Sequence, residues 1–227
     1  MKKILLIIFL FFSIIHSANA HISHYKNLKK IEMEILRNNK IIGYNYFFFK
    51  REKDLTLITN QFKFETKVLG ITVFEVEGFS EEKYYKDALI SFKSKTKQNK
   101  KDKYVDLTFD KKNNEFIING SSYSGKAKTN NIIGNWWNHK ILQSESQISP
   151  ISGSIKKQTV TFIGKEKVKI YEKTFDTEHF KLKSTNQNLP EEKKLNFDIW
   201  FDKKTGLIVK VKYSRMGEWE YRLKNFE

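Results

Sequence analysis

Apolar and polar residues alternate along most of the chain, which is the pattern of strands that bury one face. Residues 30–35 read Lys, Ile, Glu, Met, Glu, Ile, and residues 41–49 form a second apolar-rich run. Between them stand Asn38 and Asn39, and asparagine tolerates the left-handed backbone conformation that tight turns need. The sequence therefore predicts a β-hairpin at the start of the chain.

The same pattern recurs through the rest of the sequence and predicts further strand pairs. Gly206 ends a Lys-Lys-Thr-Gly turn, where a positive φ is often required. Gly70 is expected at a bulge or bend. The other predicted strands cover residues 61–68, 72–76, 88–96, 103–109, 115–118, 195–201, 207–213 and 218–223.

Helix signals are few. Residues 130–144 fit a short helix or an ordered loop, and residues 183–194, with Pro190, fit an exposed loop. The chain shows neither an internal repeat nor a linker. We therefore predict a mainly β fold over residues 21–227, as one domain: a single curved antiparallel meander sheet or partly open barrel, with one or two short helices.

The first twenty residues have the three parts of a cleavable signal peptide. Lys2 and Lys3 precede the apolar run 4–15, and residues 17–20 place small side chains before the expected cleavage after Ala20. A twelve-residue helix spans only about 18 Å, too short for a bilayer core of about 30 Å. The sequence thus predicts export to the periplasm.

The composition is strongly basic, with 42 Lys and Arg against 26 Asp and Glu and a net charge of +16. Only four of the basic residues are arginine, the residue that nucleic-acid and phosphate sites favour. We therefore expect no specific nucleic-acid partner. A lysine-rich surface does predict weak, salt-dependent association with anionic membrane surfaces. There is no cysteine, so no disulfide supports the fold.

No motif points to catalysis or to a cofactor. His21 and His24 lie close together near the expected mature N-terminus, but no carboxylate or cysteine ligand is near them, so no metal site is predicted. No serine lies in a nucleophile elbow, and the Asp and Glu residues occupy surface-like strand positions.

The most distinctive local cluster is Trp136, Trp137, Asn138 and His139. Large apolar rings with polar tips are suited to line a sugar or lipid pocket, so these four residues are the candidate ligand-binding site. The alternative is structural: one tryptophan plugs the end of the β-core and the other packs on the surface.

Three segments together carry a family resemblance: Glu32-Met33 to Gly43, Phe62 to Gly70, and Asp198 to Asp202 with Gly206, Leu207 and Val209. In this order they resemble an exported bacterial family, the domain of unknown function 6134. The wider group is similar to periplasmic lipoprotein carriers. That resemblance implies a curved antiparallel sheet around a hydrophobic cavity, but no catalytic or binding residue.

We therefore expect a noncatalytic binding or carrier module for an apolar or amphipathic ligand, such as a lipid, at the cell envelope. Two other classes stay open. An envelope enzyme would have a polar pocket with converging titratable groups, and a structural or interaction protein would expose an apolar patch or an unpaired sheet edge. A completely filled core would contradict the carrier hypothesis.

Overall fold

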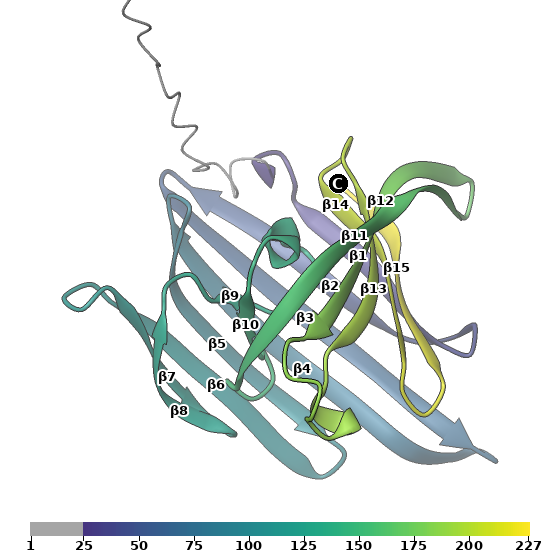
Figure 1. Cartoon of the computed structure of the whole chain (residues 1–227), viewed down its shortest axis with the longest axis horizontal. Helices are drawn as coiled ribbons and strands as arrows, with labels where there is room; N and C mark the ends of the chain where they lie inside the picture. Colours follow the sequence, from purple (N-terminus) through teal and green to yellow (C-terminus); the bar gives the residue numbers. More distant parts are fainter. Residues whose placement is uncertain (1–24) are drawn as a thin grey trace, which may run out of the picture.

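The computed structural model describes residues 25–227, and its fold is a single sheet of fifteen strands (Figure 1). The predicted signal peptide and the His21–His24 segment lie outside the described residues. The strands are β1 (Lys30–Arg37), β2 (Lys40–Glu52), β3 (Leu55–Val68), β4 (Ile71–Tyr85), β5 (Ala88–Gln98), β6 (Lys101–Asp110), β7 (Glu115–Gly120), β8 (Tyr123–Lys128), β9 (Ile132–Ile133), β10 (Ser146–Ile148), β11 (Ile155–Ile170), β12 (Lys173–Ser184), β13 (Asn196–Asp202), β14 (Leu207–Ser214) and β15 (Glu218–Phe226).

Two meanders meet where the first strand pairs with the last. From β1 the sheet continues through β2 to β8 on one side, and through β15 to β11, β10 and β9 on the other. All pairs are antiparallel except β9 with β10, which is parallel. Strands β8 and β9 form the two edges, so the curved sheet does not close. This confirms the predicted mainly β meander with a partly open barrel shape.

The predicted turns are confirmed at both ends of the chain. Asn38 and Asn39 have φ of 48° and 63° between β1 and β2, and Gly206 has φ of 71° before β14. The expectation for Gly70 was wrong. Leu69 and Gly70 form the turn of the β3–β4 hairpin, and the irregularity in pairing falls between Thr66 and Lys67 instead.

The segment between β8 and β11 crosses the inner side of the curved sheet (Figure 1). Ile133 and Ile148 pack against β5 to β8, whereas Ile141 packs against β12 to β14. Its only helical turn is the 3-10 turn η2 (His139–Leu142), and a second 3-10 turn, η3 (Glu191–Lys193), lies in the loop before β13. The crossing segment therefore connects opposite walls of the partly open barrel.

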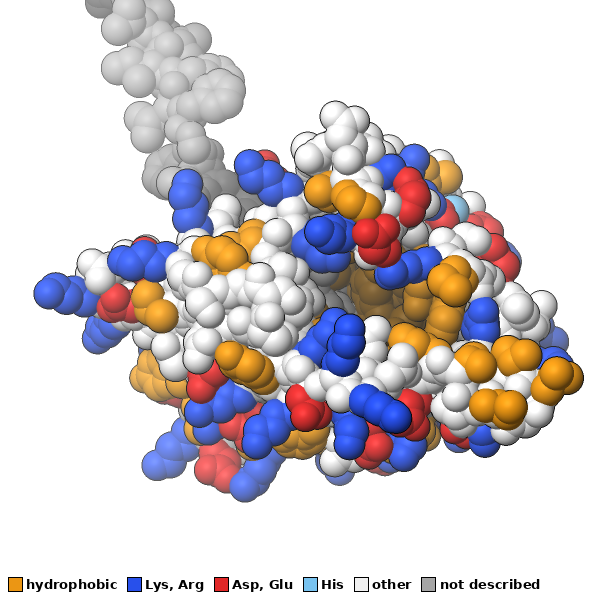
Figure 2. Space-filling view, turned by 90° about the horizontal axis from the view of Figure 1, so that it is seen from below, with side chains coloured by type: hydrophobic (Ala, Val, Ile, Leu, Met, Phe, Trp, Pro, Cys, Tyr) orange, Lys and Arg blue, Asp and Glu red, His pale blue; other side chains and the backbone are white. Residues whose placement is uncertain are grey.

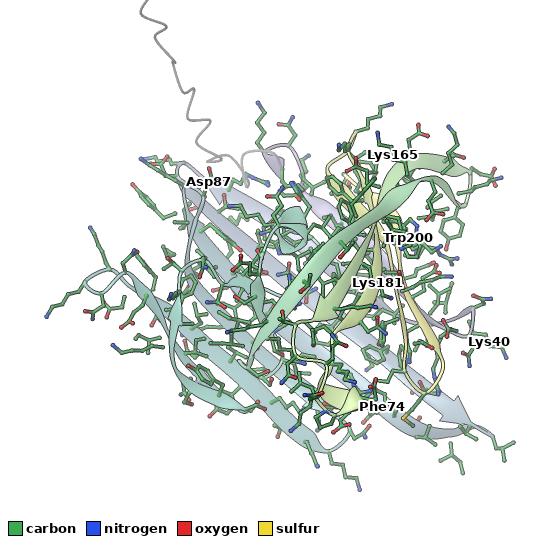
Figure 3. All side chains as sticks on the ribbon, viewed as in Figure 1. Lys40, Phe74, Asp87, Lys165, Lys181 and Trp200 are labelled. Atoms are coloured by element: carbon green, nitrogen blue, oxygen red, sulfur yellow. The ribbon has the colours of Figure 1, made fainter. Side chains whose placement is uncertain are left out.

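The two ends of the barrel differ in how well the inner face is covered. At one end, called here the filled end, Phe47, Ile58 and Trp137 are fully buried in one core cluster. The other, called the open end, carries the β1–β2, β3–β4, β5–β6 and β14–β15 turns. Figure 3 labels Phe74 near the open end and Asp87 at the opposite end.

Candidate ligand-binding site

Trp137 plugs the filled end and is not available to a ligand. Its side chain is 0% exposed. Its ring is contacted edge-on by Tyr25, Phe49 and Tyr84, with ring centroids 5.5, 5.6 and 5.9 Å away. Such edge-to-face contacts between buried rings stabilise the core. Trp137 therefore has the structural role that the sequence analysis gave as the alternative, a tryptophan that plugs the end of the β-core.

Asn138 and His139 also have structural partners at the filled end. The Asn138 Oδ1 atom accepts a hydrogen bond from the Lys140 amide at 3.0 Å and so caps η2. The His139 Nδ1 atom is hydrogen-bonded to the Tyr25 hydroxyl, which also donates to the Gly206 carbonyl at 3.1 Å. These bonds anchor the crossing segment to the N-terminal residues and to the β13–β14 turn.

A buried carboxylate, Glu82 on β4, holds the same segment from the other side. Glu82 is 1% exposed and accepts hydrogen bonds from the Trp137 Nε1 atom at 2.9 Å, the Tyr84 hydroxyl at 2.6 Å and the Asn135 amide. Burial raises its pKa to about 7, although all three hydrogen bonds act in the opposite direction.

The expectation that carboxylates occupy surface-like strand positions was wrong at Glu82. Its position alternates with those of Ser80 and Tyr84, which share its inward face and are buried. The alternation of inward and outward residues along this strand is the sequence signal that could have predicted the burial of Glu82.

Trp136 packs against the core cluster of the filled end, and its ring also joins a series of aromatic rings at the open end. Each ring lies within 6.0 Å of the next, measured between centroids. We call the series the aromatic belt; its members, from β4 around to β15, are Phe74, Phe64, Trp219, Tyr213, Phe197, Trp136 and Tyr221. Of the four residues predicted as one site, only Trp136 belongs to the belt.

The belt lies on the inner face of the sheet, yet it stays partly open to solvent. Phe74, Phe197, Tyr213, Tyr221 and Trp136 are half-buried, unlike the fully buried inner residues of the filled end. Seen from the open end, the molecule is hollowed, with hydrophobic side chains inside and Lys or Arg on both sides (Figure 2). At this end the hollow thus gives solvent access to the inner face.

Two tyrosine hydroxyls add polar groups to the belt. Neither the Tyr213 nor the Tyr221 hydroxyl has a hydrogen-bond partner within residues 25–227. Burial raises the pKa of Tyr221 to about 12, and burial together with the nearby Tyr221 raises the pKa of Tyr213. Both hydroxyls therefore stay protonated at neutral pH and can donate hydrogen bonds.

Two cations lie near this end of the belt: Arg215 is close to Tyr213, and Lys156 is close to Arg215. Lys156 precedes Gln158 by two residues on β11 and shares its inward face, where Gln158 donates to the Ile141 carbonyl at 2.8 Å. Burial lowers the pKa of Lys156, and the nearby Arg215 lowers it further. The Lys156 ammonium donates to the Lys193 carbonyl at 3.3 Å, but within the described residues neither cation pairs with a carboxylate. The pair leaves positive charge uncompensated beside the belt.

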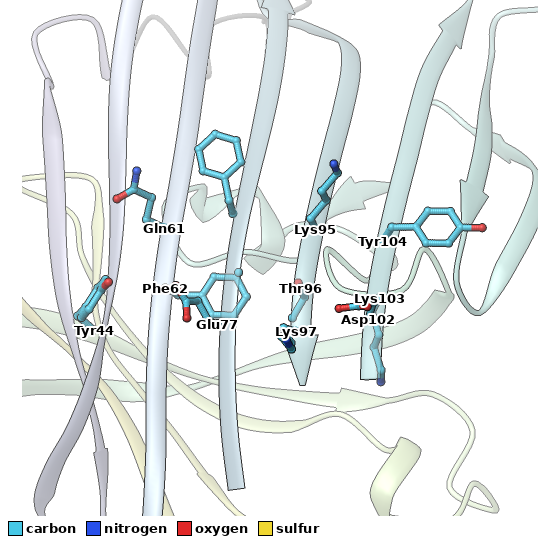
Figure 4. Close-up of a pocket in the computed structure, with 12 residues that line it drawn as sticks. Tyr44, Gln61, Phe62, Glu77, Lys95, Thr96, Lys97, Asp102, Lys103 and Tyr104 are labelled. Carbon is cyan, nitrogen blue, oxygen red and sulfur yellow. The ribbon is translucent and has the colours of Figure 1, made fainter. Parts of the chain in front are cut away.

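A separate furrow of about 670 Å³ lies on the outer face of β2 to β6 (Figure 4). Its two walls are cross-strand rows of side chains that point away from the barrel, one with Phe79, Lys95 and Tyr104 and the other with Tyr44, Glu77 and Lys97. Because its walls alternate cations, carboxylates and rings along an open sheet surface, it does not enclose an apolar ligand.

The outer face also carries a charged cluster around His179 on β12. Its Nε2 atom lies 2.9 Å from Asp198 and its Nδ1 atom 3.3 Å from Glu166, while its ring stacks on Trp200 at 4.5 Å. Lys181 lies 2.6 Å from the same Asp198. Both ring nitrogens of His179 thus already have carboxylate oxygens as neighbours within the fold.

Residues 25–227 contain no group of three or more His, Asp or Glu side chains placed to hold a metal ion. Over the same range, no helix combines the length and the apolar character needed to cross a bilayer.

Comparisons with known proteins identify a solved structure of similar fold and the family of this chain. A search of curated proteins gives no match. Among solved structures, the chain is similar to the crystal structure of a β-barrel-like protein of the domain of unknown function DUF1849 from Brucella abortus. The TM-score is 0.58 at 8% identity, over 88% of this chain and 96% of that chain. At this identity the likeness concerns the fold alone. The family model of DUF6134, a domain of unknown function, matches residues 33–224, so the chain belongs to that family.

Proposed function

We propose that the protein is a noncatalytic binding or carrier module for an amphipathic ligand with an acidic head group, acting in the periplasm. The observation that carries the proposal is the contrast between the two ends of the barrel. The inner face is packed shut at the filled end, whereas half-buried aromatic rings remain accessible at the open end.

The aromatic belt supports the apolar part of the ligand. Rings such as Phe197 and Trp136 present apolar surface that water reaches, and covering that surface with an acyl chain releases about 25 cal/mol per Å². A ligand that also has a polar end can stay partly solvated at the mouth of the hollow. An amphiphile fits both requirements better than a purely apolar molecule.

The cations beside the belt support an acidic head group. Lys156 and Arg215 carry positive charge without a carboxylate partner, and the hydroxyls of Tyr213 and Tyr221 are donors without an acceptor in the described chain. A carboxylate or phosphate placed among them would accept charge-assisted hydrogen bonds, each worth about 1.5–3 kcal/mol. Fatty acids and anionic lipids share this chemistry.

The filled end limits the size of the ligand. Trp137 and Glu82 block the inner face there, so the ligand enters only the open half of the barrel. The envelope-enzyme alternative has less support, because the buried Glu82 makes three hydrogen bonds within the core and His179 lies between two carboxylates on the outside.

Isothermal titration with dodecanoate and with methyl dodecanoate tests the proposal on the mature chain. We expect saturable binding of dodecanoate, at least tenfold tighter than binding of the uncharged ester, since only the acid can pair with Lys156 and Arg215. In the double variant Lys156→Ala/Arg215→Ala the preference for the acid should disappear while both compounds still bind.

The matched control is Lys95→Ala/Lys97→Ala, which removes two cations from the outer furrow and should leave the preference intact. Absence of dodecanoate binding by the unmodified mature chain would overturn the proposal. Loss of the preference in the control but not in the test variant would move the ligand to the outer furrow.

A further inference from the structure

The β3–β4 hairpin projects beyond its neighbours at the open end. The pairing of β2 with β3 stops at Gly43 and Phe64, and the pairing of β4 with β5 stops at Val76 and Gln98. Glu75 still hydrogen-bonds with Asn99 of the β5–β6 turn, whereas residues 66–68 and 71–74 pair only with each other. At about 3.3 Å per residue, this two-stranded ribbon extends roughly 13 Å past the sheet.

The end of this ribbon is apolar and exposed. We call residues 67–73 the β3–β4 tip. Leu69 is 97% exposed, Ile71 is 70%, Val68 is 54% and Val73 is 52%. Soluble surfaces scatter single apolar side chains, but a contiguous group of this kind marks a site of interaction.

The backbone conformation of Leu69 also supports an interaction site at the tip. Leu69 has φ of 50°, a left-handed conformation that favours Gly and Asn over a branched apolar side chain. A leucine at this position stabilises the fold neither by burying its side chain nor by adopting a backbone conformation that it favours. Contacts within the described residues therefore do not account for an apolar side chain at this position.

The surroundings of the tip are basic. Lys63 pairs with Glu77 at 3.0 Å at the base of the hairpin, and Lys67, the first residue of the tip, pairs with Glu65 at 2.8 Å, which leaves the ribbon itself close to neutral. The β5–β6 turn at the same end, taken with the adjoining strand ends as residues 97–103, holds four lysines against one aspartate. Within the described residues none of these four lysines has a carboxylate partner. The tip is thus apolar beside a cationic turn.

We propose that the β3–β4 tip inserts into the surface of a lipid bilayer that contains anionic head groups. The apolar side chains would enter the boundary between head groups and acyl chains, and the lysines of the β5–β6 turn would contact the head groups, each worth a modest electrostatic gain. A second copy of the chain is a poorer occupant, because it would bring two sets of like charges together.

The tip lies directly beside the hollow. Phe74 follows Val73 on β4, and with Phe64 it forms the end of the aromatic belt nearest the hairpin. Insertion would therefore hold the mouth of the hollow close to the lipid surface, where an amphiphile could pass between the two. This docking site goes beyond the proposed ligand site and does not depend on it.

The chain has no cysteine, which permits a clean test with a single label. Leu69→Cys, carrying the environment-sensitive fluorophore NBD, is compared with Tyr85→Cys at the far end of β4, where Tyr85 is 51% exposed. With vesicles containing phosphatidylglycerol, we expect the emission at position 69 to increase and shift to the blue. The emission at position 85 should stay unchanged.

A second pair of variants measures affinity by co-sedimentation with the same vesicles. Leu69→Asn/Ile71→Thr keeps residues suited to the turn and the strand, and it should reduce the bound fraction at least tenfold. Tyr85→Thr should have no effect. Equal NBD responses at both positions, or unchanged sedimentation of the double variant, would overturn the proposal. A blue shift at position 69 without vesicles, together with a dimeric mass, would assign the tip to a second copy instead.

Because dodecanoate titration needs no vesicles, the two proposals fail separately. If the chain binds dodecanoate but not vesicles, the proposed ligand site stands and the proposed docking site is refuted. If it binds vesicles but not dodecanoate, the docking site stands and the ligand site is refuted.

Discussion

Replacing Glu82 by glutamine removes a buried titratable group while keeping its shape. Glutamine can still accept from the Asn135 amide and the Trp137 Nε1 atom, and its own amide can donate to the Tyr84 oxygen. The variant therefore preserves the contacts between β4 and the crossing segment. What it changes is how the free energy of unfolding depends on pH.

The magnitude follows from the pKa of Glu82, which burial raises from the ordinary value of 4.5 to about 7. Below pH 4.5 the carboxyl is protonated in both the folded and the unfolded chain, and its contribution to stability is fully present. As the pH rises toward 7 the unfolded chain loses its proton first, so the folded state becomes less favoured. Above pH 7 the contribution is lost, and the whole difference amounts to about 3 kcal/mol.

Urea unfolding followed by far-ultraviolet circular dichroism, at intervals from pH 4.5 to 8, measures this effect. Relative to Glu82→Gln, the unmodified chain should lose about 3 kcal/mol of unfolding free energy across that range. The matched control is Glu81→Gln, which removes the adjacent carboxylate that forms an ion pair with Lys83 at 3.0 Å. Parallel pH curves for Glu82→Gln and the unmodified chain would refute the reasoning, since they would mean that Glu82 titrates alike in both states.

Three further substitutions test other parts of the account. Trp137→Ala should lower the unfolding free energy by about 3–5 kcal/mol in urea titration, because it empties the plug of the filled end; a loss below about 1 kcal/mol would contradict that role. Gly43→Ala should cost roughly 1–3 kcal/mol, since the added Cβ would lie 2.0 Å from the Lys63 carbonyl oxygen, whereas Gly164→Ala, with open space around the Cβ, should cost nothing by the same measurement. His179→Gln should leave dodecanoate affinity in calorimetry unchanged, and a tenfold loss would point to the outer cluster as the binding site.

The sequence predicts the strands well because burial on one face imposes a period of two. Local turns can be predicted equally well from the sequence. Asn38 and Asn39, for example, adopt the left-handed conformation that asparagine tolerates. Gly70 was misjudged because a glycine between two alternating runs fits a bulge as well as a turn. Only the pairing of residues 65–68 with residues 71–75 decides between them.

The candidate site could be predicted only in part, because it depends on contacts between distant parts of the chain. Trp136 and Trp137 are adjacent at a bend of the chain, and one side chain reaches the belt while the other forms the plug. Lys156 and Arg215 come together only because β11 and the β14–β15 turn lie at the same end of the sheet. No local pattern encodes these distances.

Quenching of tryptophan fluorescence by 11-bromoundecanoate tests the central claim most directly, because bromine quenches only rings that it approaches closely. Of the four tryptophans, Trp136 and Trp219 lie in the aromatic belt, Trp137 is fully buried, and Trp200, which is 8% exposed, stacks on His179 outside the belt. We expect saturable quenching that undecanoate does not cause. It should be lost in Trp136→Phe/Trp219→Phe and retained in Trp200→Phe. Quenching that survives in the double variant and disappears in Trp200→Phe would contradict the account.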